Sequence, residues 1–320
     1  MKRASSSLYL LIILILLLIG VLEVNAMSKK TYAKSTLKIK VANGKDFSVV
    51  GNVKIVDDFQ MTPLDRKRRI WIYLPPDYNQ SNKRYPVLYM HDGQKVFDMP
   101  VGHRVEWEVD ESLERLFNEN KTDGVIVVAV EHGGESGNYY RYREYAPWSI
   151  YNSQGEAPPV EADDYVEFIV SKLKPYIDNN YRTLKEREHT GIAGSSLGGL
   201  ISLYAGLKYP NVFSKIGAFS PSLWVGYNES SKGNGMIFDW IQTREIQEEM
   251  KIYLYVGGQE VGGNLEQSKF FRNNVVSFYN LLQQIGFKKD DLKLVIDEEG
   301  NHYENYWAKY FPKAYLWLFE

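Results

Sequence analysis

Cysteine is absent from the 320 residues of this chain. Its absence excludes both a disulfide framework and a metal site built on thiolates. Basic residues are not in excess either, since 38 Lys and Arg stand against 40 Asp and Glu and the net charge is -2. A chain without a basic field has little to attract nucleic acid, so we expect no nucleic-acid partner. An ordinary hydrophobic core must stabilise the fold.

Motifs for metals, cofactors and repeats are also missing. The sequence has no H-E-x-x-H pattern or carboxylate cluster that suggests a metal, and no G-x-G-x-x-G after a predicted strand. We therefore expect no metal, dinucleotide or other cofactor. No Pro/Ser-rich linker, low-complexity tract or repeat of roughly 20–50 residues divides the chain. The simplest partition is one domain over residues 27–320.

A long hydrophobic run occurs at the N-terminus. Lys2 and Arg3 precede the apolar stretch Leu8–Leu22, and small residues follow in Val24–Ala26. This order is typical of a secretory signal peptide, which we predict over residues 1–26 with cleavage after Ala26. The alternative is an uncleaved anchor, but 15 apolar residues fall short of the ~20 that a membrane span needs. We expect a secreted or periplasmic protein with no stable membrane span after cleavage.

Apolar runs and amphipathic segments alternate from about residue 85 onward. Continuous apolar strands between helices are typical of a mostly parallel sheet that is covered on both faces. The pattern predicts a doubly wound α/β sheet. The predicted strands lie within 85–93, 124–134, 189–194, 215–224, 250–258 and 291–302, and the helices within 109–120, 162–181, 197–210, 265–287 and a C-terminal segment through Trp307 and Leu316.

The N-terminal part of the domain has a different pattern. Segments 36–44, 48–56 and 68–78 are strand-like and have no helix between them. Consecutive strands without crossover helices favour antiparallel pairing. We therefore predict an antiparallel N-terminal extension at one edge of the same sheet.

A G-x-S-x-G pattern lies between a predicted strand and a predicted helix. Gly194 and Gly198 flank Ser196 at its centre, whereas Ser195 would be flanked by larger residues. A nucleophile at a sharp strand-to-helix turn has strained backbone angles, and the residues two before and two after it must be small. The N–H of Leu197 would then face a developing oxyanion at the helix N-terminus. The alternative is a glycine-rich turn with a buried serine.

A serine nucleophile needs a base and an acid, which follow it in the order Ser, acid, His in this kind of sheet. Of five histidines, only His302 follows Ser196, and it comes just after the last predicted strand. Glu260 follows the preceding strand and is our candidate for the acid. The alternative is the acidic run Asp297–Glu299, which leaves the same strand as His302.

A second oxyanion donor is expected from the loop after an early strand. The segment Tyr89–Asp98 supplies that loop. Gly93 would let the backbone approach a substrate, and the N–H of Gly93 or Gln94 can point into the site. We favour a hydrogen-bonded turn, rather than a catalytic role, for His91 and Asp92.

Taken in order, several segments resemble the putative-esterase family of α/β-hydrolases. They are "VLYMHDGQKVFD", "WEVDESLERL", "REYAP", "GSSLGGLISLYAGLKYP", "SPSLW" and "GNHYENYW". The family includes esterase D-like enzymes, feruloyl and acetyl-xylan esterases, mycolyltransferases and ferric-enterobactin esterases, and "HDGQ" and "GSSLGG" are most similar to the last group.

This resemblance runs from about residue 50 to residue 318. It implies an α/β-hydrolase fold with Ser196 as nucleophile, Glu260 as acid and His302 as base. Family members often carry Asp where this chain has Glu260, and α/β-hydrolases accept either acid. Because the family is broad in substrate, the resemblance indicates the reaction type far better than the substrate.

An aromatic segment, Tyr139–Tyr151, follows a predicted strand end and should overhang the reactive edge of the sheet. Within it, Tyr142 and Arg143 are our candidate substrate-binding residues, with Trp224 as a further pocket wall. Aromatic faces beside cations suit catecholates, aromatic acyl groups and sugar rings. The alternative is a surface loop whose tyrosines only pack on the domain.

The sequence thus predicts a secreted serine carboxylic-ester hydrolase that acts through a Ser-His-Glu triad and an acyl-enzyme. Its expected partner is a small-molecule or glycan-linked ester, including siderophore and aromatic esters. Two alternatives remain open: an acyltransferase of the same fold, and an exported sugar- or siderophore-binding protein without activity.

Overall fold

The computed structural model describes residues 39–42, 48–98, 105–133, 139–151, 154–227, 234–245 and 249–320. The predicted signal peptide, residues 1–26, lies outside these ranges, so its cleavage stays a prediction. Within the described part of the chain, no helix is long and apolar enough to cross a membrane.

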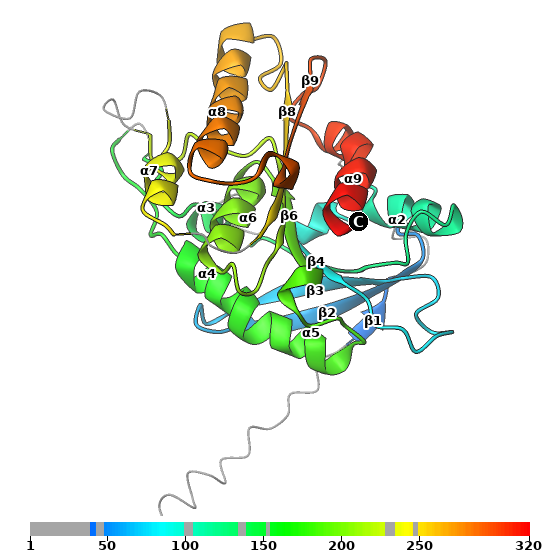
Figure 1. Cartoon of the computed structure of the whole chain (residues 1–320). Coiled ribbons are helices and arrows are strands. Elements are labelled where there is room, and N and C mark those ends of the chain that lie inside the picture. Colours follow the sequence, from blue (N-terminus) through cyan, green and yellow to red (C-terminus); the bar gives the residue numbers. More distant parts are fainter. Residues whose placement is uncertain are drawn as a thin grey trace, which may run out of the picture. The chain divides into compact units, whose positions relative to one another are not determined.

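The described strands form one nine-stranded sheet in the order β1-β2-β3-β5-β4-β6-β7-β8-β9 (Figure 1). The last six strands of the chain run parallel, whereas β1, β2 and β3 pair antiparallel at one edge and β3 meets β5 antiparallel. This confirms the predicted α/β class with its antiparallel N-terminal extension. The strands are β1 (Ile39–Val41), β2 (Asn52–Met61), β3 (Arg66–Leu74), β4 (Val87–His91), β5 (Ile126–Val130), β6 (Thr190–Ser195), β7 (Lys215–Phe219), β8 (Lys251–Gly257) and β9 (Leu292–Asp297).

Helices cover both faces of the sheet. In Figure 1, α2 and α9 lie side by side on one face, and α4, α6 and α8 lie on the other. The helices are α2 (Val109–Asn118), α3 (Tyr139–Tyr145), α4 (Ala162–Phe168), α5 (Lys174–Asn180), α6 (Leu197–Lys208), α7 (Ile237–Gln242), α8 (Leu265–Gln284) and α9 (Glu304–Phe319). A π-helical stretch, Ile169–Leu173, joins α4 to α5, so the long helix predicted over 162–181 is continuous.

Alternate strand residues pack against the two helical layers. Ile216 of β7 faces α6 and packs so closely against Gly206 that a Cβ atom there would lie 2.3 Å from Cδ1 of Ile216. Its neighbour Gly217 faces the opposite side, toward Leu318 of α9. Because successive side chains of a strand point to opposite faces, a strand covered on both sides must be apolar throughout. This explains the continuous apolar runs in the sequence.

Two segments differ from the sequence prediction. The aromatic segment after β5 was expected as an overhanging loop, but its first part is the helix α3, in which Glu144 and Tyr145 are completely buried. The short helix α7 was not predicted at all, because six residues are too few to show a helical period.

The strand order reverses at β4, near the centre of the sheet. After β4 the chain moves to β5 on one side, and it later returns to β6 on the other side of β4. In sheets of this type, ligands bind at the carboxyl ends of the strands where the order reverses. The loop after β4 and the turn after β6 meet at that point.

Candidate active site

The turn after β6 has the geometry of a strained nucleophile turn. Ser196 follows the last residue of β6 with φ 59° and ψ -122°, a region that L-residues rarely adopt. Its N–H donates to the carbonyl oxygen of Phe219 at 2.9 Å. A Cβ atom on Gly194 would lie 2.8 Å from the carbonyl carbon of Gly198. The two glycines are therefore required by mutual crowding, for the reason inferred from the sequence.

The two adjacent serines differ in exposure. Ser195 is buried and is 5 % exposed, whereas Ser196 is partly accessible. The hydroxyl of Ser196 lies 3.3 Å from the hydroxyl of Ser222, in the turn after β7. Ser196 is therefore the serine that a substrate can reach.

Backbone N–H groups are available in this turn and in the loop after β4. Leu197 is the first residue of α6, and Gly93 and Gln94 begin the short 3₁₀ helix Gly93–Lys95 after β4. None of their three N–H groups donates to another residue of the described chain. Unpaired N–H groups at helix N-termini are suited to hold an anion.

The position of Gly93 is tightly packed against β5. A Cβ atom there would lie 2.9 Å from the carbonyl oxygen of Ala129 in β5. Close packing on the neighbouring strand is therefore sufficient to require a glycine at position 93. The side chain of Gln94 is also engaged, since its Oε1 accepts from the N–H of His132 at 3.2 Å.

Glu260 and His302 meet at the ends of β8 and β9. Nδ1 of His302 lies 2.6 Å from Oε2 of Glu260, whose side chain is wholly inaccessible. The imidazole itself is 27 % exposed, and its Nε2 bonds to no other described residue. The alternative acids are engaged elsewhere: Asp297 pairs with Lys309, and Glu298 pairs with Arg272.

Two residues at this site were missed by the sequence analysis. Ser220, just after β7, donates its hydroxyl to Oε1 of Glu260 at 2.7 Å. Trp307 of α9 donates its indole N–H to the same hydroxyl at 3.1 Å, and its ring packs edge-on against His302 with centroids 5.2 Å apart. Both residues lie in segments that were quoted for the family resemblance, "SPSLW" and "GNHYENYW", but their partners are far away in the sequence.

A buried ion pair lies beneath the turn. Arg141 of α3 donates to both carboxylate oxygens of Asp92, at 2.7 and 2.8 Å, and also contacts the carbonyl oxygen of Ser195 at 3.5 Å. Burial alone would raise the pKa of Asp92, but the charge and hydrogen bonds of Arg141 outweigh burial and lower that pKa. The pair is thus fully ionised at neutral pH.

His91 is buried beside this ion pair and is not a candidate for the base. Its Nδ1 shares a hydrogen bond of 2.8 Å with the hydroxyl of Tyr165. Burial lowers the pKa of His91 to about 3, so the ring is neutral at physiological pH. The expectation of a hydrogen-bonded role for His91 and Asp92 agrees with these contacts.

The three candidate substrate residues lie in different surroundings. Tyr142 is 38 % exposed. Arg143 forms an ion pair with Glu161 and lies over the ring of Tyr139 at 5.1 Å, so its charge is already compensated within the protein. Trp224 is partly buried, and its indole N–H has no partner among the described residues.

A cavity of 660 Å³ opens beside Tyr142. Aromatic and proline side chains line it, together with one carboxylate; the lining residues are Tyr139, Tyr142, Ile150, Tyr151, Glu156, Ala157, Pro158 and Pro159. Arg143 does not line it. The cavity has the flat apolar walls that suit an aromatic or sugar ring.

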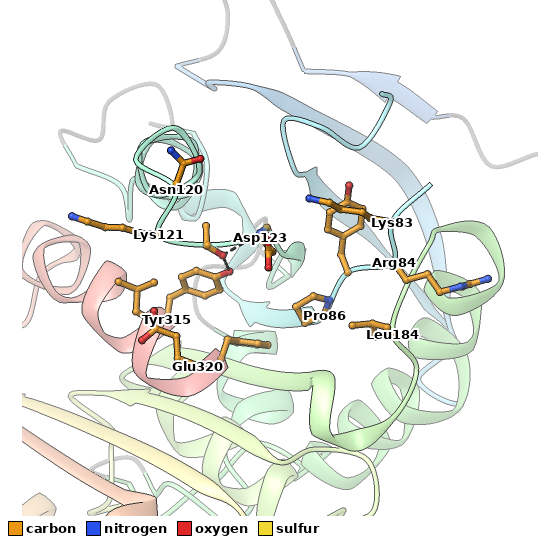
Figure 2. A pocket seen from close by; sticks show the side chains of 14 residues that line it. Lys83, Arg84, Pro86, Asn120, Lys121, Asp123, Leu184, Tyr315 and Glu320 are labelled. Atoms are coloured by element: carbon orange, nitrogen blue, oxygen red, sulfur yellow. Dashed lines mark hydrogen bonds between the residues drawn. The ribbon is translucent and has the colours of Figure 1, made fainter. Parts of the chain in front are cut away.

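A second cavity, of 610 Å³, lies at the end of the sheet where the parallel strands begin, and Figure 2 shows its lining. Pro86, which precedes β4, and Gly124, which precedes β5, belong to its lining. It is therefore at the amino ends of the parallel strands, away from the turns that follow β4, β6, β8 and β9. The described residues contain no group of three or more His, Asp or Glu side chains that could hold a metal ion.

A nine-stranded α/β sheet with a strained serine after a central strand defines the class: the chain is an α/β-hydrolase. The Putative esterase family model matches residues 62–318. The chain therefore belongs to the putative esterase family, and it is a carboxylic-ester hydrolase.

Individual relatives are distant. The uncharacterized protein YbbA of Bacillus subtilis (strain 168) is 27 % identical over 261 residues, which cover 79 % of this chain and 92 % of YbbA. The iron(III) enterobactin esterase of Escherichia coli (strain K12) is 25 % identical over 199 residues, 62 % of this chain and 43 % of that protein. The siderophore hydrolase EstA of Aspergillus nidulans has a similar fold, with a TM-score of 0.65 at 18 % identity over 87 % of this chain and 97 % of EstA.

Proposed function

We propose that the chain is a secreted serine esterase that works through Ser196, His302 and Glu260. The contact between Glu260 and His302 carries this proposal. An accepting carboxylate at Nδ1 holds the neutral imidazole in the tautomer whose Nε2 is free to accept a proton. The side chain of Glu260 is wholly inaccessible, so a carboxylate that is shielded from water stabilises the imidazolium when it forms.

In the proposed reaction, Oγ of Ser196 attacks the ester carbonyl carbon while Nε2 of His302 takes the hydroxyl proton. The carbonyl oxygen becomes an oxyanion, which the N–H groups of Leu197 and of Gly93 or Gln94 stabilise. Collapse of this intermediate expels the alcohol, which receives the proton from His302 and leaves an acyl-enzyme on Ser196. Water, activated by the same base, then hydrolyses the acyl-enzyme.

The substrate side of the proposal rests on the cavity beside Tyr142. We propose that it receives the aromatic or sugar part of a siderophore, aromatic or glycan-linked ester. Two observations support this: the aromatic and proline lining, and the names of two relatives, an iron(III) enterobactin esterase and an endo-1,4-beta-xylanase/feruloyl esterase. Arg143 would act by holding Tyr139 in place, since its own charge is paired with Glu161.

Export is a separate part of the proposal and rests on the sequence of residues 1–26. Cleavage after Ala26 gives a mature chain that begins at Met27. Edman sequencing of material recovered outside the cytoplasm tests this directly, and an intact Met1 would reject it.

A fluorophosphonate probe tests the nucleophile. Such a probe labels only an activated serine, so the wild type and the Ser195→Ala variant should be labelled, whereas Ser196→Ala should not. Hydrolysis by Ser196→Ala should fall by on the order of 10⁴–10⁶-fold. Near-normal turnover by that variant would reject the mechanism. Product analysis with and without added alcohol separates a hydrolase from an acyltransferase.

A further inference from the structure

The hydroxyl of Ser220 lies between an indole and a buried carboxylate. Its Oγ is 3.1 Å from Nε1 of Trp307 and 2.7 Å from Oε1 of Glu260. Ser220 is 1 % exposed and Trp307 is 4 % exposed, so solvent does not compete for these bonds. The three side chains come from the turn after β7, the loop after β8 and α9, which the fold brings together.

The chemistry of the groups fixes the direction of both hydrogen bonds. An indole N–H can only donate, so Oγ of Ser220 must accept from Trp307. The single proton of the hydroxyl is then left for the carboxylate, which can only accept when ionised. The N–H of Gly257 donates to the same Oε1 at 2.5 Å. Oε1 of Glu260 is thus held by two donors, and Oε2 is left for His302.

The donor to Ser220 is itself rigidly placed. The ring of Trp307 packs against Trp107 with centroids 5.5 Å apart, and edge-on against His302 at 5.2 Å. Trp107 in turn packs edge-on against Phe219, the residue before Ser220, at 4.9 Å. Because the surrounding rings fix the indole, the hydroxyl has one orientation available rather than several.

The backbone at Ser220 is unfavourable for a residue with a side chain. Its φ is 43°, in the left-handed region where glycine is favoured. Its N–H donates to the carbonyl oxygen of Tyr255 at 2.7 Å, which fixes this conformation against β8. Glycine would adopt the angle at lower cost, so the hydroxyl is what a serine adds here.

We propose that Ser220 is a positioning residue that orients Glu260 toward His302, with Trp307 fixing the direction of its hydroxyl. This inference rests on the proposed Ser196, His302 and Glu260 mechanism. Without the hydroxyl, one donor to Oε1 is lost and the carboxylate can rotate away from the line to Nδ1. The base is then less well aligned with Ser196, while the substrate cavity is unchanged.

Two variants separate the hydroxyl from the backbone. Ser220→Ala removes the hydroxyl and keeps a Cβ, whereas Ser220→Gly removes it and relieves the positive φ. Both should lower kcat by about 10–100-fold with KM within twofold, which is the loss of one hydrogen bond to a charged group. Trp307→Phe, which keeps a ring but removes the donor, should lower kcat in the same way and by less.

Proton NMR supplies a readout that does not depend on turnover. The proton between His302 and Glu260 should give a downfield signal in the wild type, and this signal should shift or vanish in both Ser220 variants. Ser214→Ala is the matched control. Ser214 lies just before β7, and its buried hydroxyl donates to the carbonyl oxygen of Arg187. This variant should leave both the signal and kcat unchanged.

The outcomes are distinguishable. An unchanged signal, or an unchanged kcat, in folded Ser220→Ala and Ser220→Gly overturns the role of Ser220. Full activity of Ser196→Ala rejects the mechanism on which the inference rests, whatever Ser220 does. If the wild type shows the signal and Ser220→Gly retains normal thermal stability but loses the signal, the positioning role is supported independently of any substrate.

Discussion

Arg141 and Asp92 are joined by two parallel hydrogen bonds of 2.7 and 2.8 Å, in which Nε and Nη2 of the guanidinium meet both oxygens of the carboxylate. Asp92 immediately precedes the N–H groups proposed to hold the oxyanion, and Arg141 also reaches the carbonyl of Ser195 before the proposed nucleophile. One guanidinium therefore ties together the two turns that meet at the centre of the sheet.

Replacement of Arg141 by alanine should destabilise the protein strongly. It leaves the buried carboxylate of Asp92 without its partner, and breaking a buried pair in this way costs about 3–5 kcal/mol. Urea denaturation measures the loss. Asp92→Asn in the Arg141→Ala background should recover part of it, because the unpaired charge is gone. A double variant that is no more stable than Arg141→Ala would contradict this explanation.

Glu260→Gln should impair hydrolysis far more than Asp297→Asn or Glu298→Gln. The amide can donate to Nδ1 and so favours the wrong imidazole tautomer, which costs about 10⁴-fold in a comparable triad. The other two carboxylates pair with lysine and arginine side chains of neighbouring helices. Steady-state kcat/KM of the three variants on one ester ranks them, and a crippled Asp297→Asn would reassign the acid.

We predict that the burial of Glu106 makes folding stability depend on pH. The side chain is 4 % exposed, accepts from the hydroxyl of Ser48 at 2.8 Å and has acidic neighbours that include Asp98 and Glu111. Burial, reinforced by those neighbours, raises the pKa of Glu106 from 4.5 to about 7. The folded state then holds a proton that the unfolded state has lost, so stability falls as pH rises from about 4.5 through about 7.

The variant Glu106→Gln should remove this part of the pH dependence. Its free energy of unfolding, relative to that of the wild type, should be larger at pH 8 than at pH 5, so the variant is relatively more stable at pH 8. Urea denaturation at both pH values measures the difference. Glu119→Gln serves as the control, because Glu119 is exposed and, within the described ranges, forms an ion pair with Lys121 alone. Equal differences at both pH values would show that Glu106 titrates normally.

Tyr142→Ala should lower kcat/KM for an aromatic or siderophore-like ester by about 3–10-fold, the range of one lost aromatic contact. Hydrolysis of p-nitrophenyl acetate should change much less, because a small acetyl group does not extend into the cavity. Tyr227→Ala is a control for general surface effects, since Tyr227 is 51 % exposed and does not line the cavity. Equal losses on both esters would mean that Tyr142 supports the fold only.

The sheet could be predicted because its physics is local. A parallel strand covered on both faces must be apolar at every position, and this is visible in a single segment such as 126–130. The turn at Ser196 was visible for the same reason, since the glycines that crowd each other are only four residues apart. The order of serine, acid and histidine along the chain then limited the partners.

The contacts of Ser220 and Arg141 could not be predicted in this way. Ser220 meets Glu260 and Trp307 across 40 and 87 residues of sequence, and only the pairing of β7 with β8 and the packing of α9 bring them together. The sequence does not reveal that Arg141 is paired, because its partner Asp92 lies 49 residues away. The sequence around a charged residue does not show whether the fold brings a residue of opposite charge next to it.

The proposed catalytic residues and the cavity walls come from separate segments of the chain. Every residue proposed for bond making and breaking sits on a connection directly after β4, β6, β8 or β9. The cavity walls, by contrast, all come from one stretch between β5 and α4, residues 139–159. If this cavity receives the substrate as proposed, replacement of residues 139–159 by the corresponding segment of a relative should change the ligand preference and keep the proposed catalytic residues. The new segment would have to retain an arginine that pairs with Asp92.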